Sequence, residues 1–234
     1  MPGIVPRLYR DPHAPPVPDG YVLARAAGSH EALMNGDESC WAPAGVITWG
    51  HPEFLTGFRA LWGARGLYVR FVSMDPSPWH TMTRHDDPLW EEEVVEVFLD
   101  PAGSGSSYYE LEISPANIVC DLRIARPWPE LQGDRAWHCA GLETVVQHAS
   151  AEPGGQPGWT ATACLPWDGL AALSDEAAVR VPPRSGDRWR FNVFRIKRPH
   201  GPAEPERDAI YAAWSVPDGP SFHAPAAFRD LVFW

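Results

Sequence analysis

Basic residues are scarce in this chain relative to acidic ones, and the imbalance limits the partners it can bind. The 234 residues include 19 Lys and Arg against 30 Asp and Glu, a formal net charge of −11. Nucleic acids and anionic membranes are bound through Lys and Arg, so the sequence predicts neither partner. No apolar run approaches the ~18 to 20 residues that a membrane-spanning helix needs.

Cysteine is also sparse, with four residues at Cys40, Cys120, Cys139 and Cys164. None belongs to a Cys-x-x-Cys pair, which excludes a zinc knuckle and a thiol–disulfide redox motif. Cys120 and Cys164 lie in strand-like runs, where we expect free thiols to pack as small hydrophobic side chains.

The N-terminal stretch MPGIVPRLYRDPHAPPVP lacks the apolar core of a signal peptide and is broken by proline. As given, the chain is therefore expected to be a soluble cytoplasmic protein, or a secreted one if a leader was trimmed.

Proline and glycine are abundant, and 26 Pro with 20 Gly suit many short strands joined by turns. We expect an extended lead-in over residues 1–20 and one domain over 21–234, without internal repeats. Residues 21–26 could be a first strand, and residues 46–49 are a short apolar run. Two strands joined by a turn are expected within residues 58–74, and further strand-like runs cover residues 93–100, 108–114, 118–124, 142–148, 159–165, 189–196, 210–215 and 231–233. They predict an all-β, antiparallel sandwich of jelly-roll or immunoglobulin-like form, with nine or ten strands and one short helix over 166–173.

The stretch LWEEEVVEVFLD, residues 89–100, alternates as a strand does. One face would carry Glu93, Val95, Val97 and Leu99, and the other Val94, Glu96, Phe98 and Asp100. Trp90 precedes the strand. An aromatic ring beside carboxylates suits a neutral polar ligand such as a sugar, because the ring packs on C–H groups and the carboxylates accept hydroxyl hydrogen bonds. The alternative is a surface strand with solvated glutamates.

A loop with His80, His85, Asp86 and Asp87 offers groups that bind metals. No further His or Cys follows at a metal-binding spacing, and the repeated Asp, Asn and Gly of a calcium loop are missing. We therefore expect a polar loop rather than a metal site.

Two catalytic or cofactor-binding alternatives stay open. A glycosidase would need two carboxylates on opposite sides of the scissile bond. The candidates are Glu91, Glu92, Glu93, Glu96, Glu110 and Glu112. Met74, Met82 and several His could ligate a haem, although there is no Cys-x-x-Cys-His attachment site. Gly-x-Ser-x-Gly, phosphate-loop and dinucleotide motifs are absent.

Four segments carry a resemblance to a known family. These segments are LMNGDESCW, RALWGARGLYVRFVSMD, PLWEEEVVEVFLD and AWSVPDGPSFHAPAAFRDLVF. They resemble the opening, the Leu-Trp turn, the central Trp-Glu signature and the closing segment of the family 9 carbohydrate-binding modules and their wider, DOMON-like relatives. The likeness spans about residues 33–233.

The resemblance implies a β-sandwich that holds a sugar between two aromatic rings, which fall on Trp90 and Phe222. The signature glutamate that hydrogen-bonds sugar hydroxyls falls on Glu96. Two positions depart from sugar-binding members: an arginine that contacts sugar aligns with Glu112, and a polar amide aligns with Phe194. Because Phe222 offers less area than Trp and no N–H donor, weak binding is expected.

The resemblance also implies structural calcium, for which Asp100 is a candidate ligand. The prediction is a non-catalytic domain of carbohydrate catabolism that binds a carbohydrate or sugar-like small molecule through Trp90, Glu96, Glu112 and Phe222. A glycoside hydrolase, a haem-binding DOMON-like domain and a protein-interaction sandwich are the alternatives.

Overall fold

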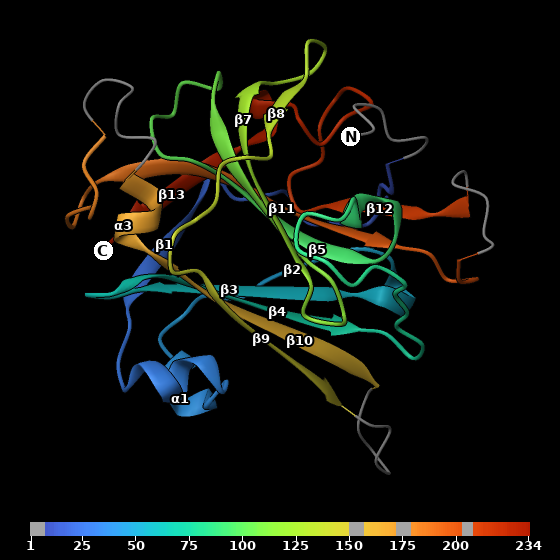
Figure 1. Ribbon diagram of the computed structural model, residues 1–234, viewed down its shortest axis with the longest axis horizontal. Coiled ribbons are helices and arrows are strands. Elements are labelled where there is room, and N and C mark those ends of the chain that lie inside the picture. The colour runs from blue at the N-terminus through green and yellow to red at the C-terminus, as the bar shows by residue number, and fades with distance from the viewer. Residues whose placement is uncertain (1–7, 150–156, 172–178, 203–207) are drawn as a thin grey trace.

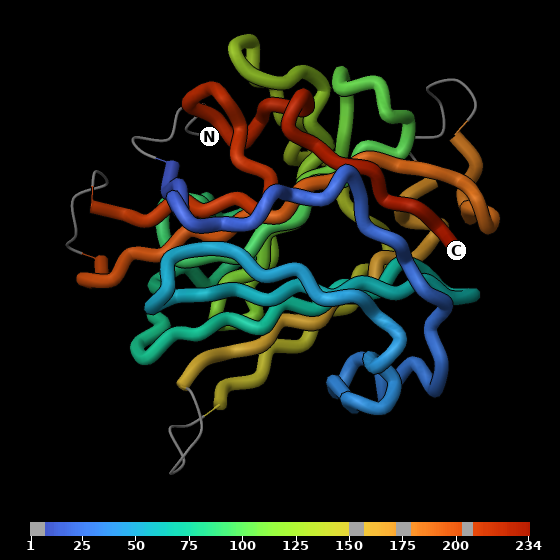
Figure 2. Tube along the Cα trace, turned by 180° about the vertical axis from the view of Figure 1, so that it is seen from behind, coloured from blue at the N-terminus to red at the C-terminus, as the bar shows by residue number. Residues whose placement is uncertain are grey.

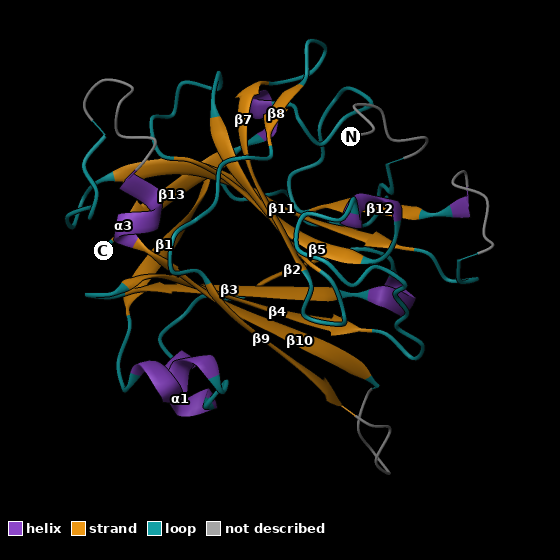
Figure 3. Cartoon of the chain, viewed as in Figure 1, coloured by secondary structure: helices purple, strands orange, loops and turns teal. Residues whose placement is uncertain are grey.

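The chain forms a mixed β-sheet that is bent into two layers, as a computed structural model shows for residues 8–149, 157–171, 179–202 and 208–234 (Figure 1). Strands dominate, and the helices are short (Figure 3). The strands are β1 (Gly20–Arg25), β2 (Ile47–Trp49), β3 (Thr56–Trp62), β4 (Gly66–Met74), β5 (Val94–Asp100), β6 (Tyr108–Ile113), β7 (Val119–Arg126), β8 (Gln132–Asp134), β9 (Glu143–Ala149), β10 (Gly158–Pro166), β11 (Arg188–Lys197), β12 (Ile210–Ala213) and β13 (Arg229–Phe233). The helices are α1 (His30–Met34), α2 (Glu38–Trp41) and α3 (Trp167–Leu170), with 3-10 turns η1 (Pro52–Phe54), η2 (Leu89–Glu91) and η5 (Pro225–Ala227).

Strand β1 joins the two layers. The first layer has the order β8-β7-β6-β5-β11-β13 with β12 added to β11, and the second has the order β3-β4-β10-β9 with β2 added to β3. Between them, β1 pairs in parallel with β13 through Tyr21 and Leu231, and with β3 through Ala24 and Leu61. Seen from behind, β1 runs between these two strands (Figure 2).

The main core lies between the layers. Val95, Val97 and Leu99 of β5 contribute to it from the first layer, as the alternation predicts. Phe58 and Trp159 are among the residues that face them from the second layer. The resulting cluster of buried side chains is continuous from one layer to the other, so the two layers share one core.

The outer face of each layer is also covered. Helices α1 and α2 cover the second layer, where Trp41 packs in a cluster with Leu61 and Cys164. On the first layer, segment 75–93 and segment 214–228 supply Trp90 and Phe222 to a third cluster. Every residue of β5 and β6 is consequently buried, so the side chains on their outer face lie inside the protein.

The all-β class is confirmed, and two details of the prediction are corrected. Thirteen strands are present among the described residues, more than the nine or ten expected. The sheet is mixed rather than antiparallel, because both pairings of β1 are parallel. The residues of one strand do not indicate whether the neighbouring strands run parallel or antiparallel to it. The three-residue strand β8 is one of the additional strands and lies outside the strand-like runs of the sequence.

Two of the three helices in the described residues were not predicted. Ser29 and Asp37 cap α1 and α2 by accepting hydrogen bonds from the backbone N–H groups of Ala32 and Ser39. The Asn35–Gly36 turn separates the two helices, and Gly36 has a φ of 75°. The third helix ends at Leu170, and residues 172–173 of the predicted helix lie outside the described residues. No helix in the described ranges is long and apolar enough to cross a membrane.

A buried ionic network links β11 to segment 75–93. Lys197 Nζ donates to Asp75 at 2.8 Å and to Glu93 at 2.6 Å, and Arg195 Nη2 donates to Asp75 at 2.6 Å. Burial opposes ionisation of Asp75, but Arg195 and Lys197 together hold its pKa below the usual value. Burial raises the pKa of Glu93 to about 7 in spite of the same cations. Arg195 also lies 4.9 Å from the ring of Trp159, so the network reaches across the core.

We predict that Lys197→Met lowers the free energy of unfolding by about 3 to 5 kcal/mol, because it leaves two buried carboxylates without their shared cation. Urea denaturation followed by circular dichroism measures the loss. The control is Arg188→Met, which removes an exposed pair with Asp230 and should change stability by less than about 1 kcal/mol. Equal effects in the two variants would contradict the assignment of the network as a stabilising element.

Candidate functional site

Three glutamates meet on the outer face of the first layer. Glu96 of β5 lies directly across from Glu112 of β6, and Glu110 lies across from Phe98. One carboxylate oxygen from each of the three glutamates lies within 4.8 Å of the others. The alternation of the two strands places all three on one face, so this cluster follows from the register of β5 against β6.

The three carboxyl groups are buried without the partners that buried carboxylates require. Glu96 and Glu110 are 2 % exposed and Glu112 is fully buried. In the described part of the chain, Glu96 Oε1, Glu110 Oε2 and both oxygens of Glu112 have no hydrogen-bond partner. Such groups are strongly disfavoured unless a ligand, a proton or a cation satisfies them.

Burial and mutual repulsion hold protons on this cluster. Burial raises the pKa of Glu110 to about 7. It also raises the pKa of Glu96 well above the usual value, with a further rise from the charge of Glu110. The pKa of Glu112 is raised in the same way, first by burial and then by its two neighbours. Near neutral pH the cluster therefore holds both hydrogen-bond donors and acceptors.

Trp90 lies beside the cluster under a cationic side chain. The turn η2 places the indole among the buried apolar side chains on the outer face of the first layer. The indole is 6 % exposed there, and its Nε1 has no hydrogen-bond partner among the described residues. The guanidinium of Arg135 lies 4.9 Å from the ring centroid. Arg135 itself is exposed, and its charge lowers the pKa values of Glu110 and Glu112 against the effect of burial.

Phe222 belongs to the same cluster of buried side chains but packs against a neighbouring ring. Its ring stacks on Phe194 with centroids 4.3 Å apart and planes 27° apart. Phe194 is the cross-strand partner of Glu96. The ring of Phe222 is 4 % exposed. The predicted second aromatic ring is thus present near the signature glutamate, with one face occupied by Phe194.

A neutral histidine, His223, lies next to the site on the side of Glu110. His223 stacks on Phe98 with centroids 5.0 Å apart, and its Nδ1 lies 2.9 Å from the hydroxyl of Tyr108. Burial lowers the pKa of His223 to about 3, so this ring is uncharged over the physiological range.

The structure brings Trp90, Glu96, Glu112 and Phe222 into one region, as predicted from the sequence. Their role in ligand binding stays a prediction. Sequence reasoning missed Arg135, because it lies in a polar segment, residues 127–142, with no motif around it. The guanidinium of Arg135 approaches the cluster from a segment outside β5 and β6.

Asp100, the candidate calcium ligand, lies at the end of β5. Its Oδ2 accepts a hydrogen bond from the backbone N–H of Gly105 at 2.8 Å, while Oδ1 has no hydrogen-bond partner in the described ranges. Burial raises its pKa. The observed contact fixes the turn between β5 and β6, and calcium binding at Asp100 stays a prediction.

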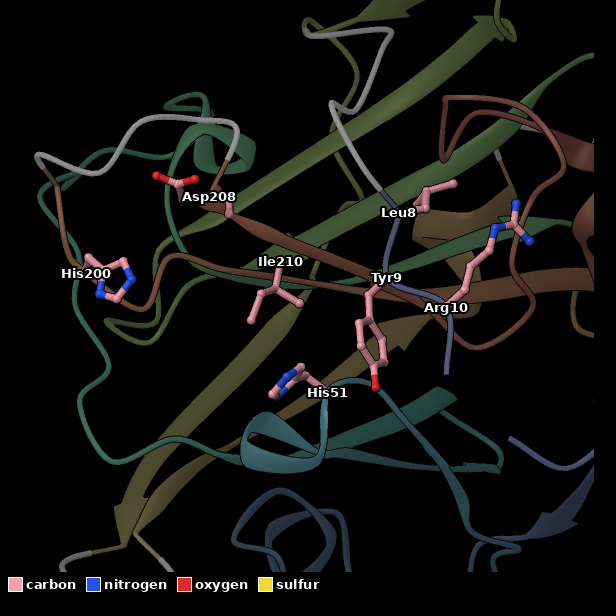
Figure 4. Close-up of a pocket in the computed structure, with 8 residues that line it drawn as sticks. Leu8, Tyr9, Arg10, His51, His200, Asp208 and Ile210 are labelled. Carbon is pink, nitrogen blue, oxygen red and sulfur yellow. The ribbon is translucent and has the colours of Figure 1, made fainter. Parts of the chain in front are cut away.

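A separate hollow of about 630 Å³ opens where the N-terminal segment meets β12 (Figure 4). The side chains of Tyr9, Arg10 and His51 line it together with His200 and Asp208. The rings of Tyr9 and His51 meet edge to face with centroids 5.2 Å apart. None of the three clustered glutamates lines this hollow, so it is distinct from the site at Trp90.

Comparison with known proteins confirms the resemblance drawn from the sequence. Residues 40–124 match the model of the carbohydrate family 9 binding domain-like proteins. This match includes Trp90 and all three clustered glutamates. A curated protein from Arthroderma benhamiae, described as an extracellular protein, is 25 % identical over 185 residues, which cover 76 % of this chain and 78 % of the relative.

Solved structures share the fold. A candidate carbohydrate-binding protein from Bacteroides uniformis superimposes with a TM-score of 0.69 at 15 % identity, covering 92 % of this chain and 99 % of the other. A family 9 carbohydrate-binding module from Caldicellulosiruptor kristjanssonii, solved with cellotriose, gives 0.62 at 11 % identity, with 92 % and 93 % covered. Its glucose complex gives 0.62 at 12 %, with 92 % and 95 % covered. At such identities the likeness shows the fold.

We predict that Glu110→Gln reduces the loss of stability that the parent protein shows as pH rises. The folded protein keeps a proton on Glu110 up to a pKa of about 7, whereas the ordinary value is 4.5. The free energy of unfolding should therefore fall as pH rises from about 4.5 to 7, and stay low above that. At pH 8 the variant should be more stable than the parent by at least about 1 kcal/mol.

Urea denaturation at pH 4.5 and pH 8 measures this difference. The matched control is Glu53→Gln, since Glu53 is exposed; this change should leave the pH dependence of stability as it is in the parent. If Glu110→Gln follows the parent at both pH values, the proposed protonation of the cluster is wrong.

Proposed function

We propose that this chain, whose residues 40–124 match the family 9 carbohydrate-binding model, is a non-catalytic domain that binds a carbohydrate at the three-glutamate cluster beside Trp90. One observation carries the proposal: four carboxyl oxygens of Glu96, Glu110 and Glu112 are buried without hydrogen-bond partners in the described ranges. Structures of similar fold have been solved with cellotriose and glucose.

A sugar supplies what this cluster lacks. Adjacent hydroxyl groups of a pyranose can donate to the carboxyl oxygens of Glu96 and Glu112 and accept from the protonated member of the cluster. The indole of Trp90 offers an apolar surface for the C–H face of the ring, and its free Nε1–H can donate to a further hydroxyl. The guanidinium of Arg135 adds donors at the rim.

Access to the cluster depends on Arg135. The indole of Trp90 is covered while Arg135 lies over it. Because Arg135 is exposed, its flexible side chain can leave the ring with little loss of packing. We infer that a ligand replaces Arg135 on the ring of Trp90, and that the guanidinium then contacts the ligand's edge.

The same geometry favours binding over hydrolysis. A glycosidase needs two carboxyl groups about 5 to 9.5 Å apart on opposite sides of the scissile bond. Glu96 and Glu112 are direct cross-strand neighbours with oxygens within 4.8 Å, and both project from one face of the sheet. They would meet a sugar from the same side, which suits recognition of hydroxyl groups.

An extracellular site of action belongs to this proposal. The relative from Arthroderma benhamiae is described as an extracellular protein, so the comparison gives no support to the expectation of a cytoplasmic protein.

Bound calcium, with Asp100 as a ligand, is proposed as a structural component and is tested by the sugar-binding assay described below. The haem alternative is tested by absorbance, since a purified protein without a Soret band does not carry haem.

We predict that cellotriose or glucose binds the purified chain with a 1:1 stoichiometry and raises its melting temperature, because ligand binds only the native state. Trp90→Ala should abolish the shift, and Glu96→Gln should weaken binding by about tenfold, because the amide NH₂ group cannot accept the hydroxyl hydrogen bond that a carboxyl oxygen accepts. Isothermal titration calorimetry measures both effects. Repeating the titrations with calcium and with EDTA distinguishes the effect of a structural ion from the effect of sugar binding.

The control for lost packing is Trp49→Ala, because Trp49 is buried to the same degree in β2 of the other layer. It should lower the melting temperature and keep the affinity. Sugar binding that survives in Trp90→Ala would place the site elsewhere. A protein that binds none of a panel of mono- and oligosaccharides would leave the protein-interaction alternative.

A further inference from the structure

We propose that His85, Asp86, Asp121 and His138 form a binding site for a divalent transition-metal ion of the zinc type. The four residues come from three parts of the chain: segment 75–93, strand β7 and segment 127–142. One ligand atom from each residue lies within 4.8 Å of the other three. The site shares no residue with the proposed carbohydrate site.

The distances between these atoms suit one central ion. His85 Nε2 lies 3.3 Å from His138 Nδ1 and 3.3 Å from Asp86 Oδ1. His138 Nδ1 lies 3.6 Å from Asp121 Oδ1 and 3.8 Å from Asp86 Oδ2. Ligands about 2.1 Å from a tetrahedral ion are about 3.4 Å from one another, so the four groups need only small adjustments to coordinate it.

A buried carboxylate oxygen with no hydrogen-bond partner points to a ligand at this position. Asp121 is 2 % exposed. Its Oδ2 accepts a hydrogen bond from the backbone N–H of Cys139 at 2.5 Å, which fixes the carboxylate. Its Oδ1 lies 2.7 Å from His85 Nε2 but outside hydrogen-bond geometry, and has no hydrogen-bond partner among the described residues. A cation between Oδ1 and the ring nitrogen would satisfy both lone pairs.

The donor set selects the kind of ion. Two imidazole nitrogens and two carboxylate oxygens are the ligands that Zn²⁺ and its neighbours in the first transition row accept. Calcium takes six to eight oxygen ligands, and two imidazoles do not suit it. This site is thus separate from the calcium proposed at Asp100.

The ligands are held in place and remain accessible. The backbone N–H of Asp86 donates to the carbonyl of Val119 at 2.9 Å, and Asp86 Oδ1 accepts from the N–H of Asp121 at 3.3 Å. These bonds attach the histidine-bearing segment to the start of β7. The side chains of His85 and His138 are 49 % and 54 % exposed, so an ion can enter from solvent.

Bound metal would join segment 75–93 to segment 127–142 through β7. We predict that Zn²⁺ binds the chelator-treated full chain with a stoichiometry of one and raises its melting temperature. Co²⁺ in the same site should give the visible absorption bands of a tetrahedral ion. His85→Ala and His138→Ala should each weaken Zn²⁺ binding by at least about tenfold. Both side chains are half exposed, so these variants should fold.

His13→Ala is the matched control, because His13 is exposed and outside the cluster; it should bind Zn²⁺ like the parent. Isothermal titration calorimetry gives the stoichiometry and affinity. Failure of the parent to bind Zn²⁺, or equal affinities in the parent and in both His85→Ala and His138→Ala, would overturn the proposal. In that case the two rings form a hydrogen-bonded histidine pair.

Discussion

Burial of β5 and β6 on both faces is the constraint on which the candidate site depends. Their inner face packs into the core between the layers, and their outer face is closed by Trp90, Phe222 and the segments that carry them. In a sheet with one solvated face, Glu96 and Glu112 would be ordinary surface residues. Covered on that face, they have carboxyl oxygens without hydrogen-bond partners among the residues that the structure describes, and the need to satisfy these oxygens gives the candidate site its chemistry.

Buried carboxyl groups have different surroundings on the two faces of the first layer. Toward the second layer, Lys197 is shared by Asp75 and Glu93 at hydrogen-bond distance, so both carboxylates have a cationic partner. On the outer face, Arg135 partly compensates the glutamate cluster, and this arginine is exposed and lies over Trp90. Carboxylates that are paired with buried cations stabilise the fold, whereas carboxyl groups that have no such partner are available to a ligand.

The segments that cover the outer face carry both proposed sites. Segment 75–93 holds Trp90 and His85, and segment 127–142 holds Arg135 and His138. Only three positions separate Arg135 from His138, so an ion on the latter would hold the segment whose arginine covers the indole. The two sites are nevertheless chemically distinct, one made of carboxyl groups and an aromatic ring, the other of imidazole and carboxylate ligands.

The sequence by itself determined the class of fold, the strands of the central region and the face on which Glu96 lies, because strand alternation is a local property. It also placed Trp90 and Phe222 near that glutamate through the family resemblance. The tertiary structure decided the parallel pairings of β1, the approach of Arg135 to Trp90 and the meeting of His85 with His138. These features depend on contacts between segments far apart in the chain, which no local periodicity encodes.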